Sequence, residues 1–264
     1  MKHSVLICPV CSSALELEGA SYQCSKGHCF DISKKGSVNL LLKGGDHGDE
    51  RSMLWARRDF LSAGYYSSLA TTVRNIASEH GGIILDMGCG EGYYSEALVG
   101  IDGAKVYAFD ISKYAAAMTA GRNKSITSFV ASSFDIPVRT GSIDCAVSIF
   151  APFDDAEVYR VLSPKGALVT AFPLPDHLLE LKEAVYDSVM LNPDSVPEHN
   201  GFELASISYV RFNMHIDQNE HIKALFDMTP YAYNTPPMLI KRLDGINTLD
   251  CRGAVAVATY KKRP

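Results

Sequence analysis

The sequence has no run of about 20 apolar residues, the length a membrane-spanning helix needs, so we expect no membrane span. Before Cys8 it also lacks the charged segment and apolar stretch of a secretory signal. The chain also has no excess of positive charge, because it contains 25 basic and 30 acidic residues, a formal net charge of −5. Any nucleic-acid binding must therefore be local. Together these absences predict a cytoplasmic protein.

The chain contains no internal repeat and no low-complexity tract. Hydrophobic residues make up 47% and charged residues 21%, which excludes a disordered chain, a collagen and a coiled coil. A length of 264 residues fits one large domain and a small module. We predict a module over 1–43, a linker and helices over 44–82, and a larger domain over 83–264.

Short apolar runs alternate with helical patterns through the larger domain, which predicts βαβ units and a parallel sheet. Before it, helical spacing over 51–79 breaks at Gly64. The less regular region after residue 173 is expected to finish the sheet with antiparallel strands. The expected strands are 83–86, 105–110, 126–130, 143–150, 166–172, 205–212 and 254–260, and the expected helices 93–98, 114–122 and 154–162.

Seven cysteines is an odd number, and four of them fall within the first 29 residues. Cys8 and Cys11 form one close pair, and Cys24 lies just before the adjacent His28 and Cys29. Two short-spaced pairs of thiolate or imidazole ligands are typical of structural zinc. His28 and Cys29 are equally suitable as the fourth ligand on spacing alone. Four unligated thiols are the alternative, and a redox pair is disfavoured because the motif does not open a helix.

The most informative stretch is 84–92, where a buried strand ends in Asp86 and a turn with Gly88, Gly90 and Gly92. A dinucleotide fold favours G-x-G-x-x-G, and an acidic loop suits a cationic sulfonium better than a pyrophosphate. The pattern resembles motif I of class I S-adenosylmethionine-dependent methyltransferases. Asp110 ends the next strand, where a carboxylate accepts ribose hydroxyls. Ser132, after the third strand, stands where many such enzymes place an acid near adenine. The alternative is a turn that uses glycine only for packing.

The segment after the fourth strand bears on the substrate. It reads Phe150-Ala151-Pro152-Phe153, without the Asn/Asp-Pro-Pro-aromatic motif of enzymes that methylate exocyclic amines of bases. Cys145 lies inside a buried strand, where it is a small hydrophobe, so covalent catalysis on a pyrimidine carbon is disfavoured.

Nearly the whole chain resembles the RlmA family of 23S rRNA (guanine-N1)-methyltransferases. The residues that carry the resemblance are Cys8, Cys11, Cys24 and His28; 31–41; 56–66; 86–94; 131–133; 150–152; 177–182; and 228–230. The family implies a Rossmann-like, mostly parallel seven-stranded sheet with a small N-terminal zinc-binding module.

The resemblance also implies roles for residues. Cys8, Cys11, Cys24 and His28 would bind Zn²⁺, leaving Cys29 outside the site. S-adenosylmethionine would contact Tyr66, the loop from Gly88 to Gly92 with Glu91, Tyr94, Ser95 and His177, in addition to Asp86, Asp110 and Ser132. The zinc module would grip a hairpin of 23S rRNA, and the family tends to form a homodimer around a basic cleft. Phe150 departs from the family, which can have tyrosine there.

Guanine N1 lies on the Watson–Crick edge, so a paired base must be splayed out and stacked. Phe150, Pro152 and Phe153 are candidates for the stacking wall, with packing of the strand end as the alternative. Arg57 and Arg58 are candidates for contacts to RNA. N1 must also lose a proton. The candidate bases are Asp154, Asp155, Asp176 and His177, and the sequence singles out none of them.

The sequence also allows two rival functions. A small-molecule methyltransferase would use 173–264 as a lid over a metabolite. A non-catalytic zinc-dependent RNA- or protein-binding module would keep the larger domain only as a scaffold, which the intact Asp86, Gly88, Gly90 and Asp110 set disfavours. Residues 1–60 carry eight basic and seven acidic residues, so this part is slightly basic in an acidic chain. A metabolite enzyme has little use for such a module.

Overall fold

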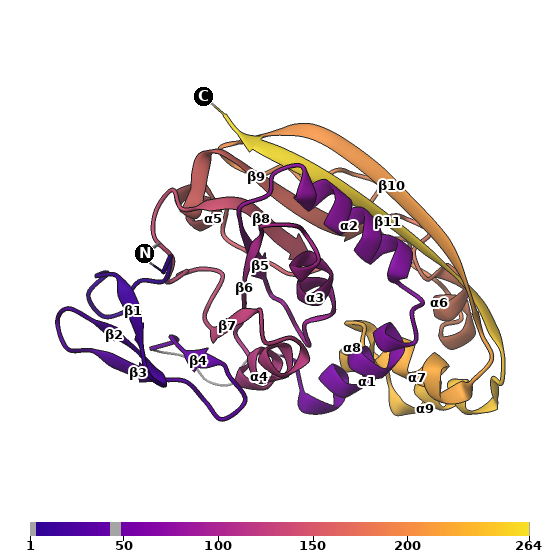
Figure 1. Cartoon of the computed structure of the whole chain (residues 1–264). Coiled ribbons are helices and arrows are strands. Elements are labelled where there is room, and N and C mark those ends of the chain that lie inside the picture. Colours follow the sequence, from indigo (N-terminus) through magenta and orange to yellow (C-terminus); the bar gives the residue numbers. More distant parts are fainter. Residues whose placement is uncertain (1–3, 43–48, 264) are drawn as a thin grey trace.

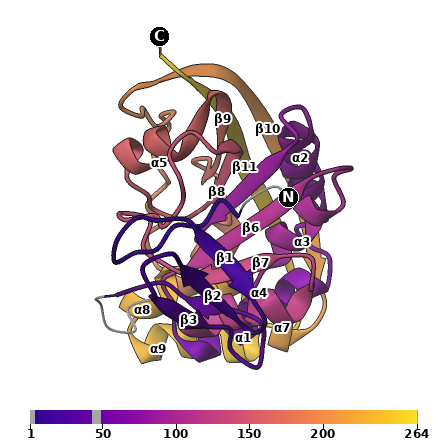
Figure 2. The same ribbon diagram turned by 60° about the vertical axis from the view of Figure 1, so that its left-hand side comes forward.

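The computed structural model describes residues 4–42 and 49–263. Its main body is an eight-stranded sheet with helices on both faces, and a small three-stranded sheet lies beside one edge (Figures 1 and 2). The order across the large sheet is β10-β11-β9-β8-β5-β6-β7-β4. The strands are β4 Val38–Asn39, β5 Ile83–Met87, β6 Lys105–Asp110, β7 Thr127–Val130, β8 Ile143–Ile149, β9 Leu162–Pro173, β10 Phe202–Ile216 and β11 Leu249–Lys262. The predicted α/β fold with a mostly parallel sheet is confirmed.

The sheet has one strand more than the seven expected. The additional strand, β4, comes from the N-terminal region and pairs in parallel with β7. At the other end, β11 is antiparallel to both β9 and β10. The strand β10 therefore runs in the same direction as the parallel strands, and β11 alone is reversed.

The helical pattern before the sheet forms two helices, α1 Arg51–Ser62 and α2 Ser67–Ser78. They are separated at Gly64, which has a φ of 89° and so provides the expected break. The helices between the strands are α3 Tyr93–Val99, α4 Lys113–Arg122 and α5 Asp155–Val161. The C-terminal region adds helices that the sequence did not predict: α6 Leu179–Val185, α7 Asn219–Asp227, α8 Tyr231–Asn234, α9 Pro237–Ile240 and the 3₁₀ helix η1 Lys241–Gly245.

Two apolar clusters cover the two faces of the sheet. Successive strand residues point to opposite faces, and on β5 Ile84 belongs to the cluster under α1, α2, α6 and α7 while Leu85 belongs to the other. This second cluster joins α5 to the N-terminal region. In the described part of the chain, no helix has the length and apolarity that a membrane crossing requires.

The N-terminal region is a ribbon of three antiparallel strands, β1 Leu15–Glu18, β2 Ser21–Cys24 and β3 Cys29–Asp31. Backbone hydrogen bonds tie it to the larger domain on both sides of the ribbon. Ile7 N donates to Pro137 O at 2.9 Å, and Leu40 N donates to Val130 O at 3.0 Å. The boundary expected at residue 43, and the linker from 44 to 48, lie outside the described residues.

Candidate active site and metal centre

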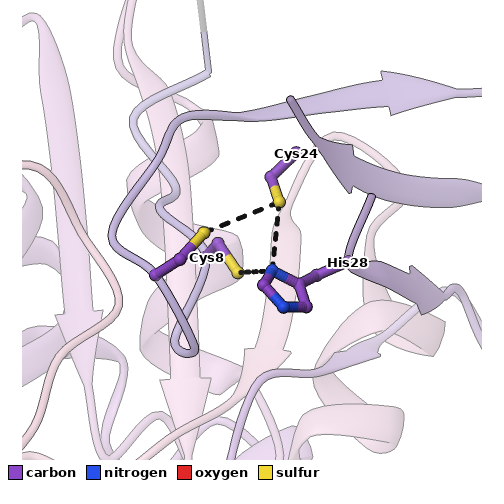
Figure 3. A group of neighbouring side chains, drawn as sticks. Cys8, Cys24 and His28 are labelled. Atoms are coloured by element: carbon purple, nitrogen blue, oxygen red, sulfur yellow. Dashed lines mark hydrogen bonds between the residues drawn. The ribbon is translucent and has the colours of Figure 1, made fainter. Parts of the chain in front are cut away.

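The ribbon brings together three thiols and one imidazole (Figure 3). The Sγ atoms of Cys11 and Cys24 lie 3.7 Å apart, and His28 Nδ1 lies 3.4 Å from the Sγ of both Cys8 and Cys24. All four ligand atoms fall within 4.8 Å of one another. With Zn–S bonds of about 2.3 Å, the sulfur atoms of a tetrahedral site are separated by about 3.8 Å. The cluster therefore has the donor set and the spacing of structural zinc.

From the sequence alone, Cys29 and His28 are alternative candidates for the fourth zinc ligand. The structure gathers His28 with the three cysteines, whereas Cys29 is exposed at the start of β3 and outside the cluster. The choice between neighbouring ligands depends on which side chain the turn points inward, and the sequence spacing does not determine that direction.

The glycine turn lies between β5 and α3, at the carboxyl end of the central parallel strand. Gly88 N and Cys89 N donate to Phe109 O at 2.9 and 3.0 Å, which fixes the turn to β6. Gly88 has a φ of 69°, and a Cβ there would lie 2.5 Å from Ala151 Cβ. Glycine is required because the turn packs directly on the loop after β8.

Two carboxylates flank this turn. Asp110 Oδ2 accepts from Gly90 N at 3.0 Å and Oδ1 accepts from Ser112 N at 2.9 Å, while burial raises its pKa. Asp86 is enclosed and accepts from Ser95 Oγ at 2.5 Å, and burial raises its pKa to about 6. Asp110 lines the cavity described next, whereas Asp86 supports the turn from behind.

A cavity of about 1400 Å³ opens above the carboxyl ends of the strands. Its wall includes the glycine turn, Asp110 and the loop from Ser132 to Phe134, and also Phe150 to Phe153 from the loop that packs on Gly88. Of the remaining residues predicted to contact the methyl donor, Tyr66, Tyr94 and His177 line it, whereas Ser95 and Gly92 lie behind the wall. One space therefore joins the donor-side and substrate-side residues.

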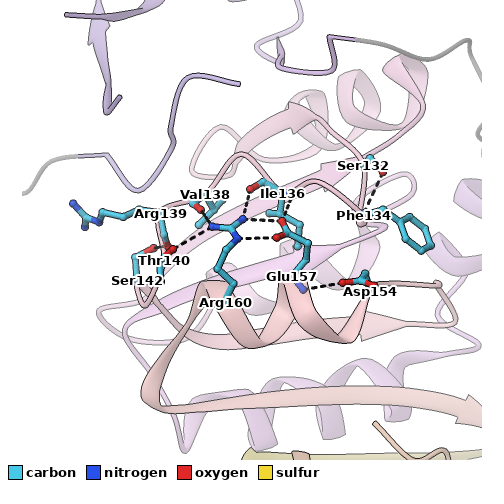
Figure 4. A network of polar contacts seen from close by, with 10 residues as sticks. All are labelled: Ser132, Phe134, Ile136, Val138, Arg139, Thr140, Ser142, Asp154, Glu157 and Arg160. Carbon is cyan, nitrogen blue, oxygen red and sulfur yellow. Dashed lines mark hydrogen bonds and ion pairs between the residues drawn. The ribbon is translucent and has the colours of Figure 1, made fainter. Parts of the chain in front are cut away.

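The loop after β7, which carries Ser132, is held by α5 (Figure 4). Arg160 donates to the carbonyl oxygens of Ile136 and Val138 at 2.7 Å, and Glu157 accepts from Ile136 N at 2.8 Å. Ser132 Oγ accepts from Phe134 N at 3.1 Å. This side of the cavity is therefore braced by a helix.

In the loop after β8, Phe150 has a φ of 57°, a conformation that is rare for a bulky residue. Its half-exposed ring stacks on His177, with centroids 5.9 Å apart. Burial lowers the pKa of His177 to about 4, so the imidazole is neutral at physiological pH. Its Nδ1 accepts from Ala254 N at 3.1 Å, which leaves the hydrogen on Nε2, toward the Tyr66 hydroxyl at 3.5 Å.

The four candidate bases have other partners. Asp154 accepts from Glu157 N at 2.9 Å and caps α5, and Asp176 pairs with Arg252 at 3.3 Å. Asp155 accepts from His199 and from the backbone, and none of these three aspartates is among the described residues that line the cavity. His177 lines it, but its acceptor nitrogen is already bonded.

The two arginines of α1 differ in position. Arg57 is the single Lys or Arg among the described residues that line the cavity. It pairs with Asp49 at 2.5 Å, donates to Met228 O at 3.2 Å and lies against Gly90. Arg58 instead lies over the ring of Trp55, 5.9 Å from its centroid.

Glu91, one of the residues predicted to contact the donor, pairs with Arg122 through one oxygen, and its buried Oε1 has no partner among the described residues. Sequence reasoning missed His199. His199 lies in an irregular segment rich in proline, without a local motif to mark it, and still reaches the cavity wall.

The strand order, the glycine turn, the strand-end carboxylates and the cavity define a class I S-adenosylmethionine-dependent methyltransferase, and the thiol–imidazole cluster adds a zinc ribbon. A family profile described as "RlmA, N-terminal" matches residues 6–42, and a profile described as "Methyltransferase domain" matches residues 85–170.

Two curated relatives match much of the chain. A 23S rRNA (guanine(748)-N(1))-methyltransferase of Streptomyces fradiae is 32% identical over 68% of this chain and 67% of its own length. YxjB of Bacillus subtilis, provisionally named a 23S rRNA (guanine-N1)-methyltransferase, is 30% identical over 94% of this chain and 93% of its own. A Bacillus halodurans structure, provisionally described as a methyltransferase, has a TM-score of 0.48 and 15% identity, covering 75% of this chain and 100% of its own. The chain belongs to the RlmA family.

Proposed function

We propose that this protein methylates N1 of a guanine in 23S rRNA with S-adenosylmethionine as the donor. The observation that carries the proposal is one cavity lined both by the glycine turn and by Phe150 to Phe153, in a chain that carries a zinc ribbon. The bound donor supplies a methyl group activated by a sulfonium. The names of the curated relatives support the choice of guanine N1 and of 23S rRNA.

The amino-acid end of the donor has partners of both signs beside the glycine turn. We propose that Arg57 binds its carboxylate and that Oε1 of Glu91, which is buried and unpaired, accepts from its ammonium. Asp110 would accept the ribose hydroxyls, and the loop at Ser132 would hold adenine. A guanidinium against Gly90 fits this task better than the RNA contact expected from the sequence.

The target base would stack on the aromatic residues that follow β8. The unusual backbone of Phe150 places its ring at the cavity wall, and Pro152 and Phe153 extend this apolar surface. Base–aromatic stacking contributes about 1–3 kcal/mol per base, enough to offset much of the cost of unstacking. Alignment and exclusion of water then favour methyl transfer.

RNA phosphates require accessible cations. Lys26, Lys34 and Lys35 are exposed on the ribbon, beside the edge of the large sheet. We propose that they contact a hairpin of 23S rRNA and that the protein works as a homodimer, both of which the family resemblance supports.

The direct test incubates the protein with S-adenosylmethionine and 23S rRNA and analyses the digested nucleosides by mass spectrometry. We expect 1-methylguanosine, at one guanine when the position is mapped by primer extension. Methyl transfer to a metabolite extract with none to rRNA would overturn the proposal in favour of a small-molecule methyltransferase.

A further inference from the structure

A histidine and an aspartate form a bonded pair at the cavity wall. His199 Nδ1 lies 2.8 Å from Oδ1 of Asp155, whose other oxygen accepts from Asn200 N at 2.7 Å. A carboxylate oxygen only accepts, so Nδ1 carries the hydrogen. The lone pair of the neutral imidazole is therefore on Nε2.

This Nε2 is buried and has no hydrogen-bond partner among the described residues. The ring itself lines the cavity and contacts Phe153 in a tilted arrangement at 4.9 Å and Tyr260 edge to face at 4.8 Å between centroids. A buried acceptor without a partner costs free energy, which an entering N–H donor would recover. Guanine N1–H is such a donor, and Phe153 belongs to the surface where we place the base.

Building on the proposed rRNA methylation, we propose that His199 is the catalytic base and that Asp155 is its positioning residue. Nε2 takes the proton of guanine N1, and the electron pair of that N–H bond forms the new bond from N1 to the methyl carbon. The S–C bond of the donor breaks with its electron pair left on sulfur, which becomes a neutral thioether. The imidazolium is stabilised by Asp155 and releases the proton to water.

The surroundings of the ring fit this role. The titratable groups that contact it are Asp155 from α5 and Tyr260 from β11. Burial raises the pKa of Tyr260, so this phenol is neutral and Asp155 supplies the negative charge. Residues 187–200 form no helix or strand, so the guanine can approach Nε2 of His199 by displacing side chains without breaking a helix or a strand.

The test compares the wild type with His199→Asn, whose amide can still donate to Asp155 but which lacks Nε2. We expect the single-turnover rate to fall about 100-fold, the lower range for a general base, with donor affinity within twofold. The wild-type rate should rise with pH and level off, whereas the variant's rate should keep rising with hydroxide. Added imidazole should restore part of the rate of His199→Ala.

A matched control is available in His215, which pairs with Asp250 at 2.7 Å on the exposed surface. His215→Asn should keep the wild-type rate and pH profile. If His199→Asn does the same, or if its rate falls without a changed pH profile and without imidazole rescue of His199→Ala, the pair has only a structural role and the inference is wrong. A wild-type enzyme that forms no 1-methylguanosine would instead overturn the proposed function, and the inference with it.

Discussion

At the scale of single residues, the carboxyl group of Asp86, behind the glycine turn, makes the free energy of unfolding depend on pH. Its carboxyl lies in the interior, where burial raises the pKa from 3.8 to about 6. Between these values the folded state binds more protons than the unfolded chain, so the free energy of unfolding falls as pH rises through this window. The full stabilising contribution of the Asp86 carboxyl is present only at pH values below its pKa in the unfolded chain.

Asp86→Asn keeps an acceptor for Ser95 but removes the charge. We therefore expect the variant to gain stability relative to the wild type as pH rises across this window, by about 3 kcal/mol at neutral pH. Urea unfolding of both proteins on either side of the window measures the difference. A difference that does not change with pH would contradict a raised pKa.

Arg57 allows a second test at this scale, because S-adenosylmethionine can be replaced by a form that lacks the carboxylate. Arg57→Ala should weaken binding of S-adenosylmethionine about tenfold or more, because a charge-assisted bond to the carboxylate is lost. Binding of decarboxylated S-adenosylmethionine should change less than twofold. Calorimetry with both ligands measures this, and Arg58→Ala is the control that should alter neither. Equal losses for the two ligands would show that Arg57 acts on the fold and does not contact the carboxylate.

The residues that the sequence predicts well are those whose partners are close along the chain. The zinc ligands fall between Cys8 and His28, and Asp110 follows Gly90 in one βαβ unit. His199 was missed because its partner Asp155 is 44 positions away and no periodic pattern connects them. The sequence likewise does not determine that Arg57 faces the cavity while Arg58 packs on Trp55.

At the scale of elements, the ribbon depends on the metal. Its three short strands bury few side chains, and zinc coordination in such modules contributes on the order of 10 kcal/mol. Cys24→Ser should lose the zinc, and amide hydrogen exchange should become fast over β1 to β4 while β5 and β6 stay protected. Cys29→Ser is the matched control and should keep one zinc per chain by mass spectrometry. Loss of zinc from Cys29→Ser would mean that the wrong ligand has been assigned.

Among the elements, the parallel strands were predicted to within a few residues because each is a short apolar run, and β5, β6, β7 and β9 each follow a helix. The strand β4 was not, because it has two residues and pairs with β7 about 90 positions later. The helices α6, α8 and α9 have only four to seven residues, too few to establish a helical period, and α7 is a nine-residue helix whose period rests on Ile222, Leu225 and Phe226 alone.

At the scale of the whole molecule, the sheet places the residues proposed for the donor and those proposed for the substrate at the carboxyl ends of its parallel strands. The glycine turn follows β5, and Phe150 to Phe153 follow β8, its direct neighbour. Such an arrangement follows from parallel connectivity, so the sequence could predict the fold and the donor side. The substrate side depends on residues of the irregular C-terminal half that converge only after folding.

The pairing of β4 with β7 has a consequence for any attempt to divide the protein. β4 occupies the hydrogen-bonding positions at the end of the sheet, and the N-terminal region packs on apolar side chains such as Phe129 and Val138. A fragment that starts after β4 would expose unpaired backbone amides next to an apolar surface, which favours aggregation through this edge. The N-terminal region thus protects this edge of the sheet, in addition to the RNA contact that we propose for it.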